Sequence, residues 1–308
     1  MVPKSRLDKL IPQVKEWAEG ISRPEGFVIG SVNDVDNYIA GKSFVRAASM
    51  DLFSLGMKQI GLSLLAAYQG QWLQANQYMA FGFARTLVSE MIGIGQLKGS
   101  DQTIADNLDG ATQVMLGTIA MGQPHLVKPF HRAVFAGIND GYGIRDGRDP
   151  PLGTTLRYAA FGMSIIGEWL GESLDLDKHA LPRDPAWGLL VAHWREPDPD
   201  KLLPVLLAVC DTHVERIAVT DREVDRHSEK FEFGSVFEAV HPTEILAVLR
   251  LREMLGLVNP ANIDHPLMKT PYARITCMPG AIIERDELLD RFVATVRERD
   301  PDVLPPGF

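Results

Sequence analysis

The sequence has few cysteines and no long apolar run, and each absence excludes a class of protein. Only two cysteines, Cys210 and Cys277, occur in 308 residues, which is too few for a disulfide framework and lacks the paired spacing of a structural zinc site. The longest apolar stretches, residues 60–68 and 162–166, are shorter than the roughly 20 residues that span a bilayer. We therefore expect a reducing environment and no transmembrane helix.

The N-terminal residues do not have the pattern of a secretion signal. Residues 1–9 are polar and charged, and no apolar core with a small-residue cleavage site follows them. We therefore expect a cytoplasmic protein, with the periplasm as the alternative compartment.

The formal net charge of −9 disfavours partners that are themselves anionic. Nucleic acid and anionic membrane surfaces would repel such a chain, whereas a basic protein would attract it. Mild acidity that serves solubility alone is an equally good interpretation. The expected partner is a protein, with no nucleic acid and no membrane insertion.

One pair of residues has the spacing of a nucleophile and its base. Cys210 and His213 are three residues apart and would share one side of a helix. Reactive cysteines are usually exposed and near positive charge, whereas Cys210 ends the apolar run 202–209. We therefore expect Cys210 to pack as a small hydrophobic residue.

The histidines do not predict a metal site. Neither His125 with His131 nor His213 with His227 has the three- or four-residue spacing with a carboxylate that helical metal sites use. A helical enzyme with a metal or small-molecule pocket built from His125, His131 or His213 remains the alternative from another functional class.

Glycine-rich and aspartate-rich segments also lack the register of a ligand loop. The glycines at 93–95 and 141–143 follow no predicted strand and have no phosphate-loop lysine. Asp140, Asp146 and Asp149 lack the spacing and the final glutamate of a calcium loop. We predict no catalytic residue, no cofactor and no bound metal, which favours a binding protein over an enzyme.

Apolar residues recur at three- and four-residue steps along most of the chain, which is the period of an amphipathic helix. Between residues 42 and 96 this period predicts two long helices joined near Gly70. Asp101 is predicted to cap a third helix, which runs to Met121, and Pro124 opens a fourth.

The segment 137–153 is rich in Gly, Asp and Pro and has no sustained apolar period, so it predicts a loop. The turn 196–200 is predicted to cap the helix that follows it, and Gly256 to end another. The helices expected after the loop are residues 154–174, 182–194, 202–217, 245–255 and 287–299.

Short connections between helices and the lack of alternating strands predict an all-α fold. The expected architecture is an irregular helical bundle or array of helical hairpins, with at most a minor short strand pair near residues 231–237. We expect an N-terminal helical block, residues 1–140, and a C-terminal block, residues 154–308. The 141–153 loop would join them into one continuous globular unit.

Two groups of acidic residues could form a recognition surface, with a solvated face as the alternative for each. The first lies near the end of a predicted helix and in the turn after it, with few bases nearby until Lys178. The second, Glu223, Asp225, Glu229 and Glu232, is interrupted by basic residues and is closer to neutral. Clustered carboxylates can meet the lysines and arginines of a nucleic-acid-binding enzyme. From charge alone, the predicted partner-binding residues are Glu168, Glu172, Asp175, Asp177, Asp140 and Asp146.

Three short segments resemble bacterial immunity proteins: Trp194-Arg195-Glu196-Pro197, residues 244–251 (Glu-Ile-Leu-Ala-Val-Leu-Arg-Leu) and residues 264–271 (Asp-His-Pro-Leu-Met-Lys-Thr-Pro). The likeness covers roughly residues 187–272. It is to the helical immunity proteins found beside type VI secretion effectors, including inhibitors of polymorphic nuclease toxins. The resemblance implies a cytoplasmic inhibitor that binds a cognate effector domain and occludes or distorts its active site. Within these segments we expect Leu246, Leu249 and Leu267 to be core residues.

These observations together predict an immunity protein that neutralises a secreted antibacterial toxin by direct one-to-one binding. A nuclease is the expected toxin, and a toxin of another class acting in the cytosol stays open. The alternatives are the helical enzyme and an adaptor chaperone that loads an effector. An adaptor would bind the toxin without abolishing its activity.

Overall fold

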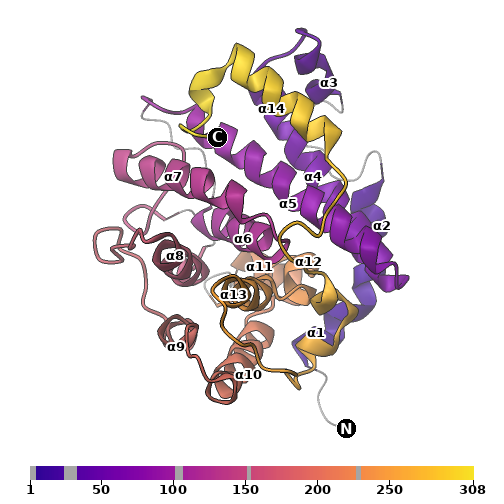
Figure 1. Ribbon diagram of the computed structural model, residues 1–308, viewed down its shortest axis with the longest axis vertical. Helices are drawn as coiled ribbons and strands as arrows, with labels where there is room; N and C mark the ends of the chain where they lie inside the picture. The colour runs from indigo at the N-terminus through magenta and orange to yellow at the C-terminus, as the bar shows by residue number, and fades with distance from the viewer. Residues whose placement is uncertain (1–4, 24–32, 101–106, 151–153, 227–229) are drawn as a thin grey trace.

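The computed structural model describes residues 5–23, 33–100, 107–150, 154–226 and 230–308, and these ranges form an all-α structure. Helices and short 3-10 turns follow one another, and the described ranges contain no β-strand (Figure 1). The predicted fold class is confirmed.

The longest elements are two helices, α4 (Val45–Tyr68) and α5 (Trp72–Gly95), which pack side by side. The turn between them contains Gly70, whose φ of +75° lies in the left-handed region that glycine adopts without strain. Both helices and the turn agree with the prediction from the apolar period. Gly56 and Gly82 lie where the helices cross, so closely that a Cβ on Gly56 would be 2.9 Å from the Gly82 carbonyl oxygen.

Helices from both ends of the chain lie at this hairpin (Figure 1). α2 (Val14–Ser22) and α3 (Asp34–Ile39) contact α4, and α14 (Glu287–Arg299) contacts α3. Tyr38 and Phe292 join α3 to α14 in an edge-to-face contact with ring centroids 5.6 Å apart. The bounds of α14 match the predicted last helix.

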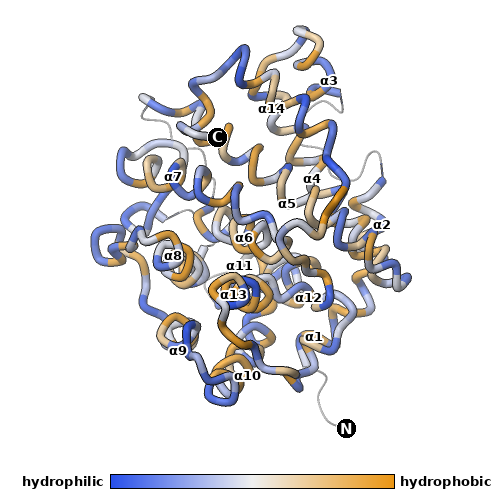
Figure 2. The backbone as a smooth tube through the Cα atoms, viewed as in Figure 1, coloured by the Kyte–Doolittle hydropathy of each residue, from blue (hydrophilic) through white to orange (hydrophobic). Residues whose placement is uncertain are grey.

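A second group of helices is arranged around two central helices, α6 (Leu108–Ala120) and α13 (Thr243–Met254), which pack on each other. All of α6 except Asp109 and Gly110 is buried. Figure 2 shows hydrophobic residues on these inner helices and hydrophilic residues along the outer loops. The remaining elements are α1 (Arg6–Leu10), α7 (Pro124–Asp140), α8 (Arg157–Leu170), α9 (Pro185–His193), α10 (Pro199–Glu215), α11 (Asp221–Arg226), α12 (Val236–Val240), η1 (Ile11–Gln13), η2 (Leu267–Lys269), η3 (Pro271–Arg274) and η4 (Pro301–Val303).

Helix ends were predicted less well than helix centres. Asn107 caps α6 by accepting a hydrogen bond from the backbone N–H of Asp109 at 2.9 Å, so the helix begins later than predicted. The expected cap, Asp101, lies outside the described residues. α8 is shorter than its predicted span because Gly171, with φ +72°, ends it. The turn before α10 does cap that helix, as predicted, through Asp198.

No strand forms at residues 231–237, which agrees with the prediction of at most a minor short strand pair there. In the described ranges the only β-type contact is a single bridge between Ile217 and Phe233. The end of the segment begins helix α12 (Val236–Val240), because Ser235 forms a capping box with the third helical residue. This local hydrogen bonding outweighs the β propensity of the neighbouring aromatic and branched residues.

The hydrophobic core is continuous between the two predicted blocks. Buried side chains of α4 to α8 and of α9 to α14 belong to one cluster of contacting residues. The division at residues 141–153 stays a prediction. None of the helices formed by the described residues combines the length and the apolar character that crossing a membrane requires.

The segments that resemble immunity proteins belong to one packed region. Arg252, which directly follows the second segment, is fully buried and donates hydrogen bonds to the carbonyl oxygens of Trp194 and Glu196, at 2.7 and 2.8 Å. The third segment packs on α10, which in turn packs on α13. Of the three leucines expected in the core, Leu246 and Leu267 are buried and Leu249 is partly buried against it.

We expect Arg252→Met to lower the free energy of unfolding by about 3 kcal/mol or more, because it leaves several buried carbonyl oxygens without a donor. Arg195→Met is the matched control, since that guanidinium is 45% exposed and pairs with Glu168 at the surface. Urea denaturation of both variants measures the difference. Equal losses would contradict the structural role of Arg252.

We expect Gly56→Ala to destabilise the protein by about 1–2 kcal/mol, because its Cβ collides with the facing backbone of α5. Gly188→Ala in α9 is the control: nothing lies within 4 Å of the added Cβ, so the substitution should stabilise by up to about 1 kcal/mol. Thermal and urea denaturation show whether each substitution stabilises or destabilises the protein. If Gly56→Ala stabilised it, the close crossing of α4 and α5 would be refuted.

Candidate functional site

The acidic group predicted near the end of α8 is largely neutralised by tertiary contacts. Glu168 pairs with Arg195 at 3.0 Å. Asp177 accepts both donors of Arg183, at 2.6 and 2.8 Å, and this contact holds the pKa of the Asp177 carboxyl below its ordinary value. The group has few basic neighbours in the sequence, but folding places Arg183 and Arg195 beside it.

The other members of the predicted set have separate roles. Glu172 lies 3.2 Å from His131 and 3.7 Å from Arg132, while Asp175 accepts backbone N–H groups of the turn that contains it. Asp140 is exposed at the end of α7. The structure therefore does not gather these carboxylates at one open surface.

Asp146 is the most buried of the six predicted residues. Its side chain is 7% exposed and is bonded to Arg148 and His179. Burial alone would raise the pKa of the Asp146 carboxyl, but the hydrogen bonds from Arg148 and His179 outweigh burial and hold it below its ordinary value. Asp146 thus joins the 141–153 loop to the segment after α8.

The histidines of the alternative enzyme do not converge. His125 lines a large hollow, His131 packs against Phe135 in α7, and His213 stacks on Phe233. Cys210 is fully buried, as predicted, and burial raises the pKa of its thiol to about 12. Among the described residues, no three or more His, Cys, Asp or Glu side chains are grouped so that they could hold a metal ion.

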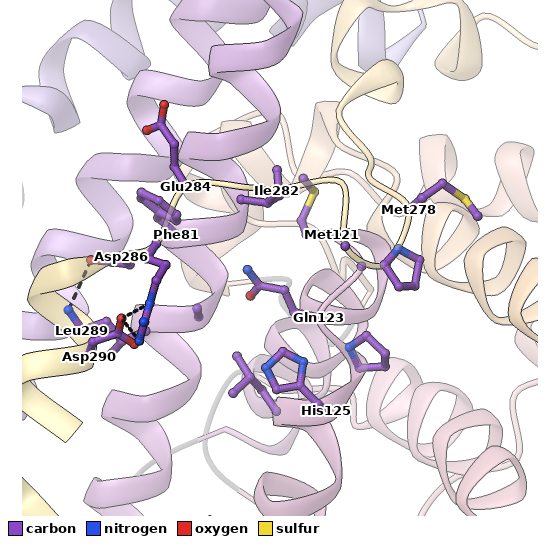
Figure 3. Close-up of a pocket in the computed structure, with 17 residues that line it drawn as sticks. Phe81, Met121, Gln123, His125, Met278, Ile282, Glu284, Asp286, Leu289 and Asp290 are labelled. Atoms are coloured by element: carbon purple, nitrogen blue, oxygen red, sulfur yellow. Dashed lines mark hydrogen bonds and ion pairs between the residues drawn. The ribbon is translucent and has the colours of Figure 1, made fainter. Parts of the chain in front are cut away.

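The large hollow has a volume of about 450 Å³ and lies between α5, the α6–α7 turn and the segment that leads into α14. Figure 3 shows Gln123 and His125 on one side of it and Asp286 and Asp290 on the other. Asp286 accepts two hydrogen bonds from Arg85 at 2.6 and 2.8 Å. Most charged groups in this hollow are already paired. The imidazole of His125 is the group that it offers to a ligand, and burial lowers the pKa of that imidazole.

A smaller hollow, of about 110 Å³, has a different character. It lies where the first turns of α6 and α8 meet the chain before and within α12. Three carboxylates and three aromatic side chains line it, together with Gln113. We call it the acidic hollow; its defining residues are Asp109, Glu232, Glu238, Tyr158, Phe231 and Phe233.

Asp109 connects two helices at the acidic hollow. Its carboxylate oxygens accept the backbone N–H groups of Leu156 and Ala159, at 3.1 and 2.8 Å, and so cap the start of α8. Burial raises the pKa of the Asp109 carboxyl to about 6 despite these hydrogen bonds. The group is therefore mostly ionised at neutral pH.

Glu232 has a fully buried side chain and two strong partners. The Trp187 indole N–H donates to it at 2.6 Å, and Arg216 forms an ion pair with it at 2.7 Å. Burial raises the pKa of Glu232 to about 7, while Arg216 acts in the opposite direction. Among the described residues, Arg216 is the only cation that forms an ion pair with a carboxylate of the acidic hollow.

Glu238 completes the polar wall, and Tyr158 also lines the hollow. One oxygen of Glu238 accepts the N–H groups of Gly234 and Ser235, and within the described ranges its other oxygen has no hydrogen-bond partner. Tyr158 is 3% exposed, and its hydroxyl is withdrawn from water and has no hydrogen-bond partner among the described residues. Burial raises the pKa of Tyr158 well above its ordinary value, and the nearby carboxylates, Glu244 first, add to this effect.

A buried polar network lies behind the acidic hollow. His213 bonds to Glu244 at 2.8 Å, with both side chains fully buried. His241 contacts the hydroxyl of Thr243 at 2.7 Å, and Gln113 donates to the same hydroxyl at 2.9 Å. The network therefore fixes the back wall of the hollow.

Sequence reasoning did not find the acidic hollow. Along the chain, Glu232 belongs to a group that is nearly neutral, and the charge pattern does not single out Asp109 or Glu238. The local signals that could have indicated these two residues are helix caps, which predict structure rather than binding. Their proximity depends on how α6, α8 and α12 pack.

Comparisons of the chain with protein-family models, with curated proteins and with solved structures found no match.

We expect stability to fall as pH is lowered from about 6.5 to about 4, partly through His241. Burial is the main cause that lowers the pKa of this fully buried imidazole from 6.5 to about 4. The unfolded chain therefore binds a proton in this range that the folded chain does not, which removes about 3 kcal/mol of stability. The His241→Gln variant lacks this titrating group, so the difference in free energy of unfolding between the native protein and the variant should become smaller towards pH 4. Urea denaturation at several pH values measures the free energy of unfolding of both proteins. If both lost the same free energy between pH 6.5 and pH 4, His241 would not be a cause of the pH dependence.

Proposed function

We propose that this protein is an immunity protein that binds a cognate secreted antibacterial toxin in the cytosol of the producing cell and blocks it. The observation that carries the proposal is the acidic hollow. It places Asp109 and Glu238 beside Glu232, with one paired arginine among them. Such a site suits a basic protein.

The toxin that fits best is a nuclease. An enzyme that binds nucleic acid uses lysine and arginine side chains to hold phosphates. An acidic surface on an inhibitor competes for these cations, raises the association rate and selects the partner. The overall charge of −9 acts in the same direction.

The resemblance to type VI immunity proteins adds support of another kind. Its three short segments are separate in sequence but belong to one packed region around α13. Their leucines and the neighbouring Arg252 stabilise the scaffold, whereas the acidic hollow is lined by residues at the starts of α6 and α8 and before and within α12. A scaffold with this division can keep its packing while its binding surface adapts to a particular toxin.

We expect co-expression of this chain with the product of the adjacent effector gene to restore growth and to yield a stable one-to-one complex on co-purification. Growth restored without a complex would point to an enzyme that repairs the damage. A complex without restored growth would identify an adaptor chaperone. Loss of binding on reversing Glu172, Asp175 and Asp177 to Lys would extend the interface to the end of α8, and unchanged affinity would remove that group from it.

A further inference from the structure

The large hollow is a cavity that the proposed function does not use. Its volume of about 450 Å³ falls within the range of roughly 300–1,000 Å³ that is typical of small-molecule pockets. Half-buried apolar side chains form much of its wall: Phe81, Leu126, Ile282 and Leu289. Figure 3 shows Ile282 on one side of the hollow and His125 on the other. An apolar wall with few polar groups is the usual composition of a ligand pocket.

The charged groups that line the large hollow are already engaged by other protein groups. Asp286 accepts two hydrogen bonds from Arg85, and both side chains are more than nine-tenths buried. Asp290 pairs with Arg285 at 2.9 Å, and Glu284 accepts a hydrogen bond from a side-chain amide of α5. A charged ligand would have to break these contacts or enter without a counter-ion, which is unfavourable. The hollow therefore suits an uncharged ligand.

The imidazole of His125 is the polar group that remains for a ligand. No other described residue forms a hydrogen bond or an ion pair with it, and burial is the cause that lowers its pKa. A neutral imidazole has one donor nitrogen and one acceptor nitrogen. It can therefore bind an N–H or O–H group of an uncharged molecule. An aromatic ring that carries this group also suits the neighbouring Phe81, because aromatic rings attract one another in stacked and edge-to-face contacts.

One side of the large hollow is a segment of chain that is fixed at both ends. We call this segment, residues 277–286, the strap. At one end the backbone N–H of Cys277 donates to the Ala120 carbonyl oxygen at 3.1 Å. At the other end Asp286 holds Arg85 at 2.6 Å. Residues 279–281 and 283–285 between these ends are exposed, so the middle of the strap can move while both ends stay in place.

The middle of the strap carries an apolar side chain that the fold leaves in water. Ile283 is 90% exposed, which is the highest fraction among the large hydrophobic residues that the structure describes. It lies next in sequence to Ile282, which lines the hollow. Gly280 has a φ of +79°, in the left-handed region, and gives the strap a turn at which it can bend. An inward movement of the strap would bury Ile283 on a ligand in the hollow.

We propose that the large hollow binds a small uncharged aromatic molecule with one N–H or O–H group, and that the strap closes over this molecule through Ile283. None of the residues that line the large hollow lines the acidic hollow. The site therefore does not depend on the proposed function, and it can be tested on this chain alone.

The test follows the δ1-methyl signals of ¹³C-labelled isoleucine, with indole as the probe. Indole should shift the signals of Ile282 and Ile283 saturably at about millimolar concentration or below. Ile11, which lies in η1 and does not line the hollow, is the internal control. Indole-3-acetate has the same ring with a carboxylate and should bind about tenfold more weakly. Unmoved Ile282 and Ile283 signals, or equal binding of indole-3-acetate, would overturn the proposal.

A second probe separates a small molecule from a tryptophan side chain of a protein partner. N-acetyltryptophanamide carries the indole ring on a peptide backbone. It should bind about tenfold more weakly than indole, because a strap closed over the ring leaves no exit for that backbone. Equal or tighter binding would assign the hollow to a side chain of a partner and would overturn the proposal.

Two exposed residues can be changed without disturbing the core. Ile283→Ser should leave the free energy of unfolding unchanged and weaken indole binding about fivefold, because the strap loses its apolar contact. Val258→Ser, at a residue that is 64% exposed and outside the hollow, is the matched control. His125→Ala should also weaken binding about fivefold, with His193→Ala in α9 as its control. Native affinity in either variant, followed at the Ile282 signal, would overturn the part of the proposal that rests on the changed residue.

Discussion

The buried contact between His213 and Glu244 is the constraint around which the second half of this protein is built. Two ionisable groups are withdrawn completely from water, and such a pair is tolerated only when hydrogen bonds hold it in place. His213 also bonds to the Ala239 carbonyl oxygen, and His241 to that of Ile275. These contacts join α10, α12 and α13 to the chain that leads towards α14. Displacing any one of them would leave a buried polar atom unpaired, so the arrangement is specific.

The acidic hollow depends on this constraint for its shape. Its carboxylates have structural roles: Asp109 caps α8, Glu238 completes the capping box of α12, and Glu232 holds Trp187 and Arg216. Each is therefore fixed before any partner arrives. A binding site whose acceptors are already ordered loses little conformational entropy on association. Acidic side chains at the end of α8 differ, because neighbouring arginines and backbone groups already engage most of them.

Helical structure was predictable because local rules produce it. The apolar period of residues 42–96 gave both long helices, and the pattern of residues 287–299 gave the last helix with its observed bounds. Predictions were weakest at helix ends, such as the start of α6 and the end of α8. Within residues 231–237, one capping serine decided where a helix begins. A helix cap depends on a single side chain, so a pattern of apolar residues taken over many positions does not detect it.

By itself, the sequence determined the all-α class, most of the helices, and the burial of Cys210, since periodicity and local composition are properties of neighbouring residues. Only the tertiary structure decided which charges are free to meet a partner. It paired Glu168 and Asp177 with arginines that are not their sequence neighbours, and it brought Asp109 within one hollow with Glu238. Electrostatic interactions depend on distance in space and on burial. A count of charges along the chain contains neither.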